Sequence, residues 1–372
     1  MTLSRLIAVF SLIALISGSA TAQSWPVAET AAKQAYLIDE STGTVLYEKA
    51  STEQMPTSSM SKIMTAYLVF EAIKNGQLTM DQTLPVSEHA WRMQGSKMFV
   101  HVGDQVKVED LIRGMIIQSG NDACVVLAEG VAGSEEAFAR KMTERAKELG
   151  LTNSNFANST GWPDPNHYST PKDLAVLAGR LMRDFPEQYH FYSEKDFTFN
   201  GIKQGNRNPL LYNMNGADGV KTGHTEIAGY GLIGSAMRDG RRLIMVVNGL
   251  ESMQARADES RKLLEWGFSQ FRTVSLAEAG APLDELAVWY GMAATVPVAS
   301  PTPIKLTLPY GVQPSAKIVA QTPVPAPVVK GQQIAELVVS LPGQEDKKYP
   351  LLATADVAEL GFWGRVQKKL GL

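Results

Sequence analysis

The chain has 372 residues, of which 44% are hydrophobic, and a formal net charge of −3. This length and composition suffice for one large domain and a smaller one. The near balance of charge argues against a nucleic-acid partner, which would require a basic excess. The single cysteine, Cys124, excludes an intramolecular disulfide. Because Cys124 lies in an apolar helical stretch, we expect a small core residue rather than a reactive thiol.

The N-terminus has the pattern of a secretory signal peptide over residues 1–22. One arginine precedes an apolar run from Leu6 to Ile16, and the segment ends on the cleavage pattern Ala20-Thr21-Ala22. The run is shorter than the ~20 apolar residues that a membrane span needs. We therefore expect the mature chain to begin at Gln23, with an uncleaved anchor as the alternative.

The elements expected next along the chain alternate between strands and helices. Residues 35–50 predict a hairpin around Ser41-Thr42-Gly43, and residues 62–76 predict a helix that ends at Asn75-Gly76. Residues 105–150 are expected to be mostly helical. A further helix is expected over 169–185, where Thr170 is a good N-cap and Pro171 suits the first helical position.

Two apolar strands then meet across Asp239-Gly240, a dipeptide typical of tight hairpins, and residues 252–271 predict a closing helix. Strands at both ends with helices between them indicate an α+β domain whose terminal strands share one sheet. We assign residues 23–272 to this domain.

The composition changes after about residue 273, where short β-prone runs are broken by proline and glycine. Residues 273–352 predict a small all-β domain that offers no catalytic cluster and could serve as a spacer. In residues 353–372, Val357, Leu360, Trp363, Val366 and Leu370 recur at helical spacing beside basic residues. This amphipathic helix could lie in a membrane interface or pack on the protein itself.

The chemistry of the chain centres on Ser59 and Lys62, which are one helical turn apart. A serine hydroxyl needs a base within reach to become a nucleophile, and a lysine can be that base only when desolvation or a nearby cation lowers its pKa. Alone, S-x-x-K is a weak signal. A second copy, Ser169 to Lys172, is explained as the start of the helix over 169–185.

Two further motifs strengthen the assignment. Ser119-Gly120-Asn121 is the only S-x-N in the chain and Lys221-Thr222-Gly223 the only K-T-G. Each alone would be explained as a turn beside a helix or strand. The ordered set S-x-x-K, S-D-N, K-T-G is the signature of class A β-lactamases and penicillin-binding proteins, and the second motif of this chain departs from it by reading S-G-N.

Each member of the set has a physical role. Ser59 would attack a carbonyl, Lys62 would take its proton, and Ser119 would relay a proton to the leaving amine. Asn121 would hold Lys62 or a substrate amide. Lys221 would lower the pKa of Lys62 and attract a carboxylate, to which Thr222 would donate. Gly223 would let a peptide approach the strand edge, and the N–H groups of Ser59 and His224 would form an oxyanion hole.

The chain resembles the D-alanyl-D-alanine carboxypeptidases, the low-molecular-mass penicillin-binding proteins of the type 5 and 6 group. The resemblance extends beyond the three motifs, to segments such as VGDQVKVEDLIRGMIIQSGNDAC and DGVKTGHTEIAGYGLIGSA, and to the downstream β domain and terminal helix. It implies that Ser59 is acylated with Lys62 as base. It further implies that Arg256 binds the terminal substrate carboxylate, for which a guanidinium fork is suited. Arg207 matches another family position.

The resemblance predicts a serine-type carboxypeptidase of the periplasm, attached to the outer face of the cytoplasmic membrane. It would remove the terminal D-alanine from peptidoglycan stem peptides, limit cross-linking, and be acylated by β-lactam antibiotics. No histidine pair has the spacing of a metal motif, and neither a metal nor a cofactor is expected. The alternatives are a β-lactamase, a DD-endopeptidase, and a non-enzymatic scaffold that binds stem peptides.

Overall fold

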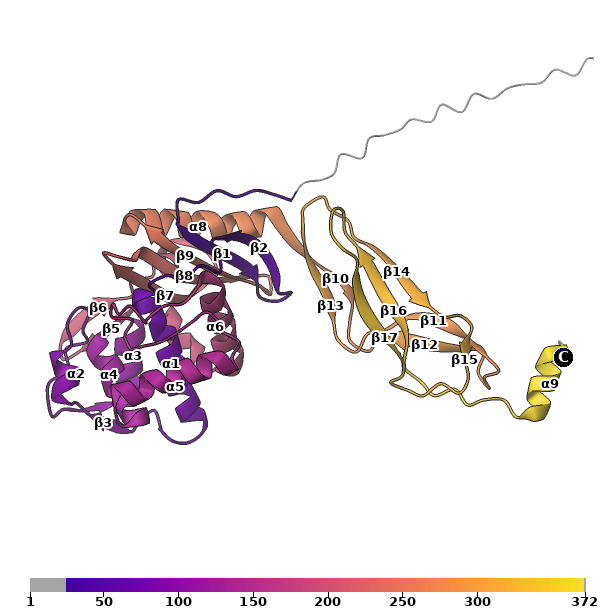
Figure 1. The fold of residues 1–372 in the computed structure, drawn as a ribbon, viewed down its shortest axis with the longest axis horizontal. Coiled ribbons are helices and arrows are strands. Elements are labelled where there is room, and N and C mark those ends of the chain that lie inside the picture. The colour runs from indigo at the N-terminus through magenta and orange to yellow at the C-terminus, as the bar shows by residue number, and fades with distance from the viewer. Residues whose placement is uncertain (1–24, 371–372) are drawn as a thin grey trace, which may run out of the picture. The chain divides into compact units, whose positions relative to one another are not determined.

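The computed structural model describes residues 25–370, drawn as a ribbon in Figure 1. The chain divides into two compact units, which we describe separately. The first unit comprises residues 26–281 together with 302–310, and the second comprises residues 282–301 together with the chain from Gly311 onward. The expected signal peptide, residues 1–22, lies outside the described residues.

A five-stranded antiparallel sheet organises the first unit, in the order β2-β1-β9-β8-β7. Its strands are β1 (Gln34–Asp39), β2 (Thr44–Lys49), β7 (Ala217–Thr225), β8 (Gly229–Arg238) and β9 (Arg241–Leu250). The predicted hairpins are confirmed: Gly43 turns the first, and Asp239 and Gly240, both with positive φ, turn the second. Strand β1 pairs with β9, so the two ends of this domain share one sheet as predicted.

Helices cover both faces of this sheet (Figure 1). A Cβ on Gly267 of α8 (Met253–Gln270) would meet Leu243 of β9, whereas Gly179 of α6 (Pro171–Asp184) approaches the next residue, Ile244. Because successive residues of a strand point to opposite faces, α8 and α6 lie on opposite sides. The remaining α-helices of the first unit are α1 (Lys62–Lys74), α2 (Glu88–Arg92), α3 (Val108–Ile116), α4 (Asn121–Ala132), α5 (Glu135–Glu148) and α7 (Leu210–Asn213).

Side-chain caps explain several helix starts. Thr170 accepts a hydrogen bond from the N–H of Asp173, and Pro171 occupies the first helical position of α6, as predicted. Ser134 and Ser252 cap α5 and α8 in the same way.

Cys124 is fully buried in α4, which confirms its assignment to the core, and burial raises the pKa of its thiol to about 12.

Shorter elements complete the first unit. They are the 3₁₀ turns η1 (Ser58–Ser61) and η2 (Tyr189–Ser193), and the two-stranded pairs β3 (Thr83–Pro85) with β4 (Gln105–Lys107), β5 (Asp196–Phe199) with β6 (Ile202–Gly205), and β10 (Phe271–Ala277) with β13 (Ile304–Pro309). The pair β10 and β13 belongs to the first unit. The prediction had placed β13 and most of β10 in the separate β domain.

The second unit is a six-stranded sheet in the order β14-β16-β17-β12-β11-β15. Its strands are β11 (Pro282–Trp289), β12 (Thr295–Ala299), β14 (Ser315–Ala320), β15 (Val324–Pro325), β16 (Gln333–Ser340) and β17 (Lys347–Ala353). Val296, Val298 and Leu351 are completely buried and form part of its core. The prediction of a small all-β domain is therefore confirmed.

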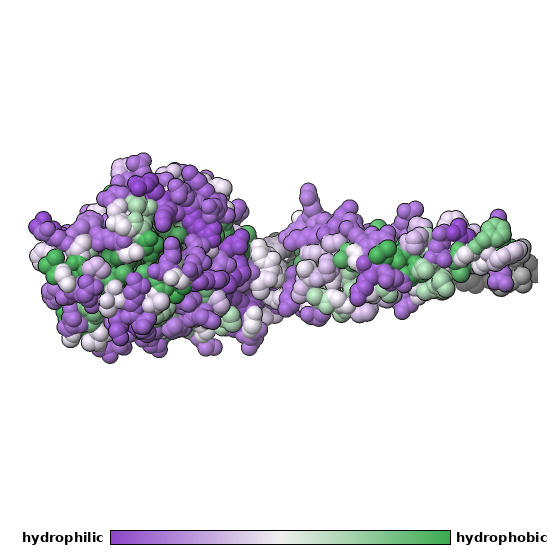
Figure 2. Space-filling model, turned by 90° about the horizontal axis from the view of Figure 1, so that it is seen from below, coloured by the Kyte–Doolittle hydropathy of each residue, from purple (hydrophilic) through white to green (hydrophobic). Residues whose placement is uncertain are grey.

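The terminal helix is shorter than predicted, because α9 spans Phe362–Leu370 rather than beginning near residue 353. Val357 is buried, and it exchanges two backbone hydrogen bonds with Val328. The apolar spacing that predicts a longer helix thus includes Val357, which forms a β-bridge with Val328 and is not part of the helix. Within residues 25–370, none of the helices combines the length and the hydrophobicity that crossing a bilayer requires. The surface seen in Figure 2 is mainly hydrophilic, with apolar patches on both units.

Candidate active site

Ser59 and Lys62 lie where η1 runs into α1, so that one short turn carries both side chains. The Nζ atom of Lys62 lies 2.8 Å from the Oγ atom of Ser59, 2.8 Å from Oδ1 of Asn121 and 2.6 Å from the carbonyl oxygen of Thr160. Only 1% of Lys62 is exposed. The ammonium is therefore surrounded by three acceptors and removed from water.

Burial lowers the pKa of Lys62 to about 8, and the positive charge of Arg207 acts in the same direction. Cys124, Asp122 and Glu135 oppose the shift but do not reverse it. With a pKa near 8, roughly a tenth of the molecules carry a neutral amine at pH 7, which is about 300-fold more than for an ordinary lysine. Lys62 can thus act as a base at neutral pH.

Ser119 and Lys221 form a second buried pair beside the first. The Nζ atom of Lys221 donates to the Oγ atom of Ser119 at 3.0 Å, and burial followed by the charges of Lys62 and Arg207 lowers the pKa of Lys221 well below its usual range. Ser119 has a φ of 60°, an unusual value for a residue other than glycine. This conformation is held at the junction of α3 and α4, where backbone strain is typical of functional sites.

Asn121 is fixed from three directions at the start of α4. Its Oδ1 accepts from Lys62, its Nδ2 donates to the carbonyl of Gln94 at 2.7 Å, and its N–H donates to the carbonyl of Ser96 at 2.7 Å. The neighbouring Asp122, which is fully buried, accepts from the backbone N–H groups of residues 98 and 99 at 2.9 Å. Asp122 thereby fixes the loop that borders the site, a positioning role that sequence reasoning did not assign.

Gly223, on the edge strand β7, has a packing role that the sequence did not predict. A Cβ atom at this position would lie 2.8 Å from the carbonyl oxygen of Thr57, 3.1 Å from Cγ of Met60 and 3.2 Å from Cβ of Ser58. The backbone that approaches Gly223 is thus the segment that carries Ser59. Thr222 beside it is buried, and the exposed ring of His224 stacks on Tyr230 with centroids 3.9 Å apart.

Arg256 belongs to the first turn of α8 and is 7% exposed. Its guanidinium lies over the ring of Tyr230 at 5.7 Å, and Nη2 donates to the carbonyl of Arg207 at 3.4 Å. Its Nε has no hydrogen-bond partner in the described part of the chain, and burial lowers its pKa. Arg207, whose side chain is exposed, donates to Oγ of Ser96 at 2.5 Å.

The cations of this site lack protein counter-ions. Within residues 25–370, none of Lys62, Lys221, Arg207 and Arg256 forms an ion pair with a carboxylate. Buried charges are normally paired, and an unpaired one is costly. This cluster is therefore suited to binding an anion from solution.

A turn over residues 158–162 forms another part of the cleft wall, and it was not predicted from the sequence. The Oδ1 atom of Asn158 accepts from the N–H groups of Thr160, Gly161 and Trp162 at 2.8–3.2 Å. This arrangement aims the carbonyl of Thr160 at Lys62. Gly161 has a φ of 81°, and a Cβ there would overlap the carbonyl oxygen of Ser58, so only glycine fits. An Asn followed by Ser-Thr-Gly is a turn signal, but the pattern does not indicate which site the turn serves.

A buried histidine supports the same turn of chain. Nδ1 of His167 accepts from the N–H of Ala157, and its Nε2 lies 2.6 Å from Oγ of Ser61. Nε2 therefore carries the proton and donates to Ser61. Burial lowers the pKa of His167 to about 4, so that the ring is neutral at pH 7 and holds Ser61 without adding charge.

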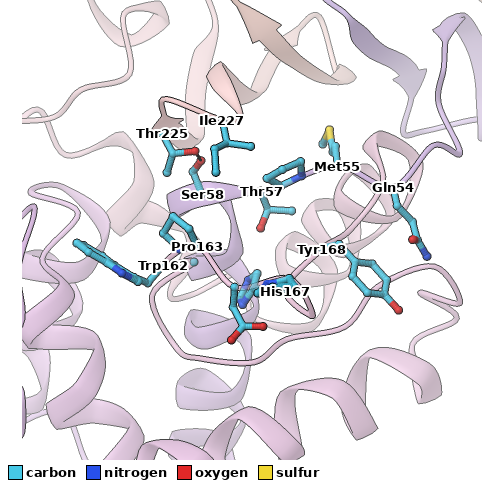
Figure 3. A pocket seen from close by; sticks show the side chains of 14 residues that line it. Gln54, Met55, Thr57, Ser58, Trp162, Pro163, His167, Tyr168, Thr225 and Ile227 are labelled. Carbon is cyan, nitrogen blue, oxygen red and sulfur yellow. Dashed lines mark hydrogen bonds between the residues drawn. The ribbon is translucent and has the colours of Figure 1, made fainter.

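The site opens into a cleft of about 580 Å³ that is lined by Ser59, Asn121 and His224, among others. Next to it lies a second hollow of about 420 Å³, shown in Figure 3. The two share Ser58, Trp162 and Thr225 as walls.

Comparisons with known proteins agree with this geometry. The family model described as "D-alanyl-D-alanine carboxypeptidase" matches residues 19–252, and that of the "Penicillin-binding protein 5, C-terminal domain" matches residues 271–359. The chain therefore belongs to the D-alanyl-D-alanine carboxypeptidase family. Members of this family are penicillin-binding serine-type hydrolases, and this chain has that class of activity.

The relatives are similar along most of their length. The D-alanyl-D-alanine carboxypeptidase DacC of Escherichia coli is 41% identical over 340 residues, which cover 89% of this chain and 85% of the relative. DacA of Haemophilus influenzae is 40% identical, covering 89% and 86%. The crystal structure of penicillin-binding protein 5 from H. influenzae superimposes with a TM-score of 0.82 at 38% identity, covering 90% of this chain and 99% of the other.

Proposed function

We propose that this carboxypeptidase removes the terminal D-alanine from peptidoglycan pentapeptide stems through an acyl-enzyme on Ser59. The observation that carries the proposal is the 2.8 Å contact between the Ser59 hydroxyl and a buried lysine whose pKa is lowered to about 8. A serine beside such a base is an activated nucleophile. By removing the residue that cross-linking consumes, the enzyme would limit cross-linking of the wall.

The hydrogen bonds around Lys62 direct its basic lone pair to Ser59. A neutral amine has two N–H bonds and one lone pair. The amide oxygen of Asn121 and the carbonyl oxygen of Thr160 can only accept, so both N–H bonds are used there. The lone pair is left facing Ser59 Oγ, which is the one partner of the three that can donate a proton.

The acylation step follows from this arrangement. Ser59 Oγ forms a bond to the carbonyl carbon while its proton moves to Lys62. The carbonyl oxygen becomes an oxyanion that the N–H groups of Ser59 and His224 would stabilise. The C–N bond to the terminal D-alanine then breaks, and its nitrogen takes a proton from the Ser119 hydroxyl, which is reprotonated from the adjacent lysines. Ser119 is suited to this because its oxygen already accepts from Lys221, which leaves its own proton free.

Water completes the cycle by adding to the ester carbon. Lys62 takes the proton from the water, the bond from carbon to Ser59 Oγ breaks, and the serine oxygen recovers the proton. The shortened stem leaves with a free carboxylate. A β-lactam would enter the same first step, since its amide bond is also opened by Ser59, and would remain attached while water adds slowly.

The unpaired cations would bind the terminal carboxylate of the stem. Thr222 offers a hydroxyl, Lys221 a charge, and Arg256 a buried guanidinium with an unused Nε donor. Charge-assisted hydrogen bonds of this kind are about twice as strong as neutral ones. The requirement for a free carboxylate at this end would make the enzyme a carboxypeptidase.

The acylation test is intact-mass spectrometry of the purified protein with benzylpenicillin, compared with Ser59→Ala. We expect a stable adduct on the wild type alone, and release of D-alanine from a pentapeptide by the wild type alone. Destruction of the antibiotic without an adduct would instead favour a β-lactamase. An intact antibiotic with no adduct and no released D-alanine would refute the proposal and leave the binding scaffold.

We further propose that the protein works in the periplasm after removal of residues 1–22, attached to the outer face of the cytoplasmic membrane through α9. The support is the exposure of Phe362 and Trp363, at 73% and 76%, beside the basic Arg365. Flotation with vesicles containing anionic phospholipid tests this. We expect the wild type to float and the double variant Phe362→Ser, Trp363→Ser to stay in the dense fraction. Equal flotation of both would contradict attachment through α9.

A further inference from the structure

Glu135, the first residue of α5, binds the turn over residues 158–162. Its Oε1 atom accepts two hydrogen bonds from Ser159, one from the backbone N–H at 3.0 Å and one from the hydroxyl at 2.6 Å. Its Oε2 atom lies 2.9 Å from Nε2 of His89, which belongs to α2. Only 11% of the Glu135 side chain is exposed, so its carboxylate is committed to these two neighbours.

The bound turn is in direct contact with α1, the helix that carries Lys62. The carbonyl oxygen of Ser159 accepts from Oγ1 of Thr65 at 2.6 Å, and that of Thr160 accepts from Nζ of Lys62 at 2.6 Å. Lys62 and Thr65 are three residues apart and therefore lie on one face of α1. Ser159, Thr160 and Thr65 are almost completely buried. Glu135 thus holds, from α5, a turn whose two consecutive carbonyls bind the face of α1 that carries the base.

The carboxylate of Glu135 also acts on Lys62 electrostatically. Burial lowers the pKa of Lys62 to about 8, and the negative charge of Glu135 opposes this shift. The other titratable groups that interact with Lys62 are Cys124, Arg207, Asp122, His167 and Lys221. Asp122 is the second carboxylate of this set, but it binds the loop at residues 98 and 99 instead of the turn. Glu135 therefore combines a contact to the turn with a charge near the base.

We propose that Glu135 is a positioning residue for the reaction: it holds the turn that aims the carbonyl of Thr160 at Lys62, and its negative charge acts on the ammonium group. This inference rests on the proposed function, in which Lys62 is the base. The two effects of Glu135 change the rate in opposite directions. Holding the turn favours proton transfer, whereas the negative charge stabilises protonated Lys62, which cannot accept a proton from Ser59. A substitution that removes the charge but keeps an acceptor separates the two effects.

The variant Glu135→Gln removes the charge and keeps an amide oxygen that can accept from Ser159. The measurement is the second-order rate constant for acylation by benzylpenicillin, followed by intact mass from pH 6 to 9. In the wild type, we expect the inflection of this rate constant near pH 8, the pKa of Lys62. In Glu135→Gln the inflection should lie about half a unit lower, a moderate effect for the removal of one charge. The ratio of the rate constant at pH 6 to that at pH 9 should therefore rise about threefold.

The variant Glu135→Ala removes both the charge and the acceptor. Its inflection should shift in the same direction, and its rate constant at pH 9 should fall about tenfold or more, because Thr160 is no longer held in place. The matched control is Glu129→Gln, which alters another partly buried carboxylate. Glu129 accepts from the hydroxyl of Ser87, the N-cap of α2, at 2.9 Å. The control should keep the wild-type rate constants at both pH values.

The outcomes separate this inference from the catalytic proposal. A lower inflection in Glu135→Gln, with the larger fall at pH 9 in Glu135→Ala, supports the positioning role. The role is overturned by an inflection at the wild-type pH in Glu135→Gln, by an equal shift in Glu129→Gln, or by a folded Glu135→Ala that keeps the wild-type rate constant at pH 9. The glutamine variant alone decides the question if the alanine variant does not fold. Wild-type protein that forms no adduct at any pH refutes the catalytic function itself.

Discussion

The substitution Gly223→Ala tests whether β7 positions the nucleophile by direct packing. The new Cβ would lie 2.8 Å from the carbonyl oxygen of Thr57, while ordinary contacts begin near 3.4 Å. The backbone of Thr57 must therefore retreat by about 0.6 Å, and Ser59 is only two residues further along. A flexible side chain could avoid such a clash by changing its rotamer, whereas the backbone of Thr57 must move as a whole.

The expected loss follows from the sensitivity of catalysis to position. A displacement of 1 Å costs about 100-fold in rate, so a shift of about 0.6 Å should cost on the order of tenfold. Overpacking should also lower the free energy of unfolding by about 1–3 kcal/mol. We expect the second-order rate constant for acylation by benzylpenicillin to fall by about tenfold or more, as measured by stopped-flow quenching or by mass.

The matched control is Gly205→Ala, in strand β6. There a Cβ would meet only Tyr212 Oη at 3.6 Å and the carbonyl of Lys195 at 3.8 Å, which are ordinary contacts. This variant should acylate at the rate of the wild type. If Gly223→Ala also acylated within twofold of the wild type while folding normally, the packing argument would be refuted.

Three further predictions follow from the charges and turns of the site. The rate constant for acylation should rise about tenfold per pH unit below pH 8 and level off above it. The reason is that protonated Lys62, with its pKa lowered to about 8, cannot accept a proton. A rate constant independent of pH between 6 and 9 would exclude Lys62 as the base. Arg256→Gln should raise KM about 10–100-fold for peptides with a free C-terminal carboxylate, the equivalent of about 1.5–3 kcal/mol. The KM of the corresponding peptide amides should not change. An equal rise in KM for both kinds of peptide would contradict carboxylate binding by Arg256. Asn158→Ala should lower the free energy of unfolding by about 2 kcal/mol in urea titrations and slow acylation, because the turn that aims Thr160 at Lys62 loses its acceptor. The exposed Asn153 provides the control for Asn158, and equal effects of the two alanine substitutions would refute this role.

The elements predicted correctly from the sequence are those that local chemistry determines. Asp239-Gly240 predicts its hairpin because both residues tolerate positive φ, and Thr170 with Pro171 predicts the start of α6 for similarly local reasons. The three motifs could be placed because each motif is short and its order in the chain is informative. The structure brings their polar side chains together, with Lys62 in contact with Asn121 and Lys221 in contact with Ser119.

The parts that could not be predicted depend on contacts distant in sequence. Strand β10 pairs with β13 across about thirty residues, which no local pattern indicates. Val357 has the spacing of a helical apolar face, but its backbone pairs with Val328 instead. Asp122 and Asn158 have the composition of ordinary caps and turns, and only the folded chain shows that both position the groups around Lys62.

The positive charges of the two lysines of the site also oppose one another. Burial lowers the pKa of Lys221, and the positive charge of Lys62 lowers it further. The pair therefore favours states with fewer than two positive charges until an anion arrives. A bound carboxylate would stabilise the charge on Lys221, and that positive charge would in turn favour the neutral form of Lys62, which takes the proton from Ser59. On this argument, the substrate's own charge helps to keep the base in its active form, so that the carboxylate requirement and the nucleophile's activation belong to one electrostatic arrangement.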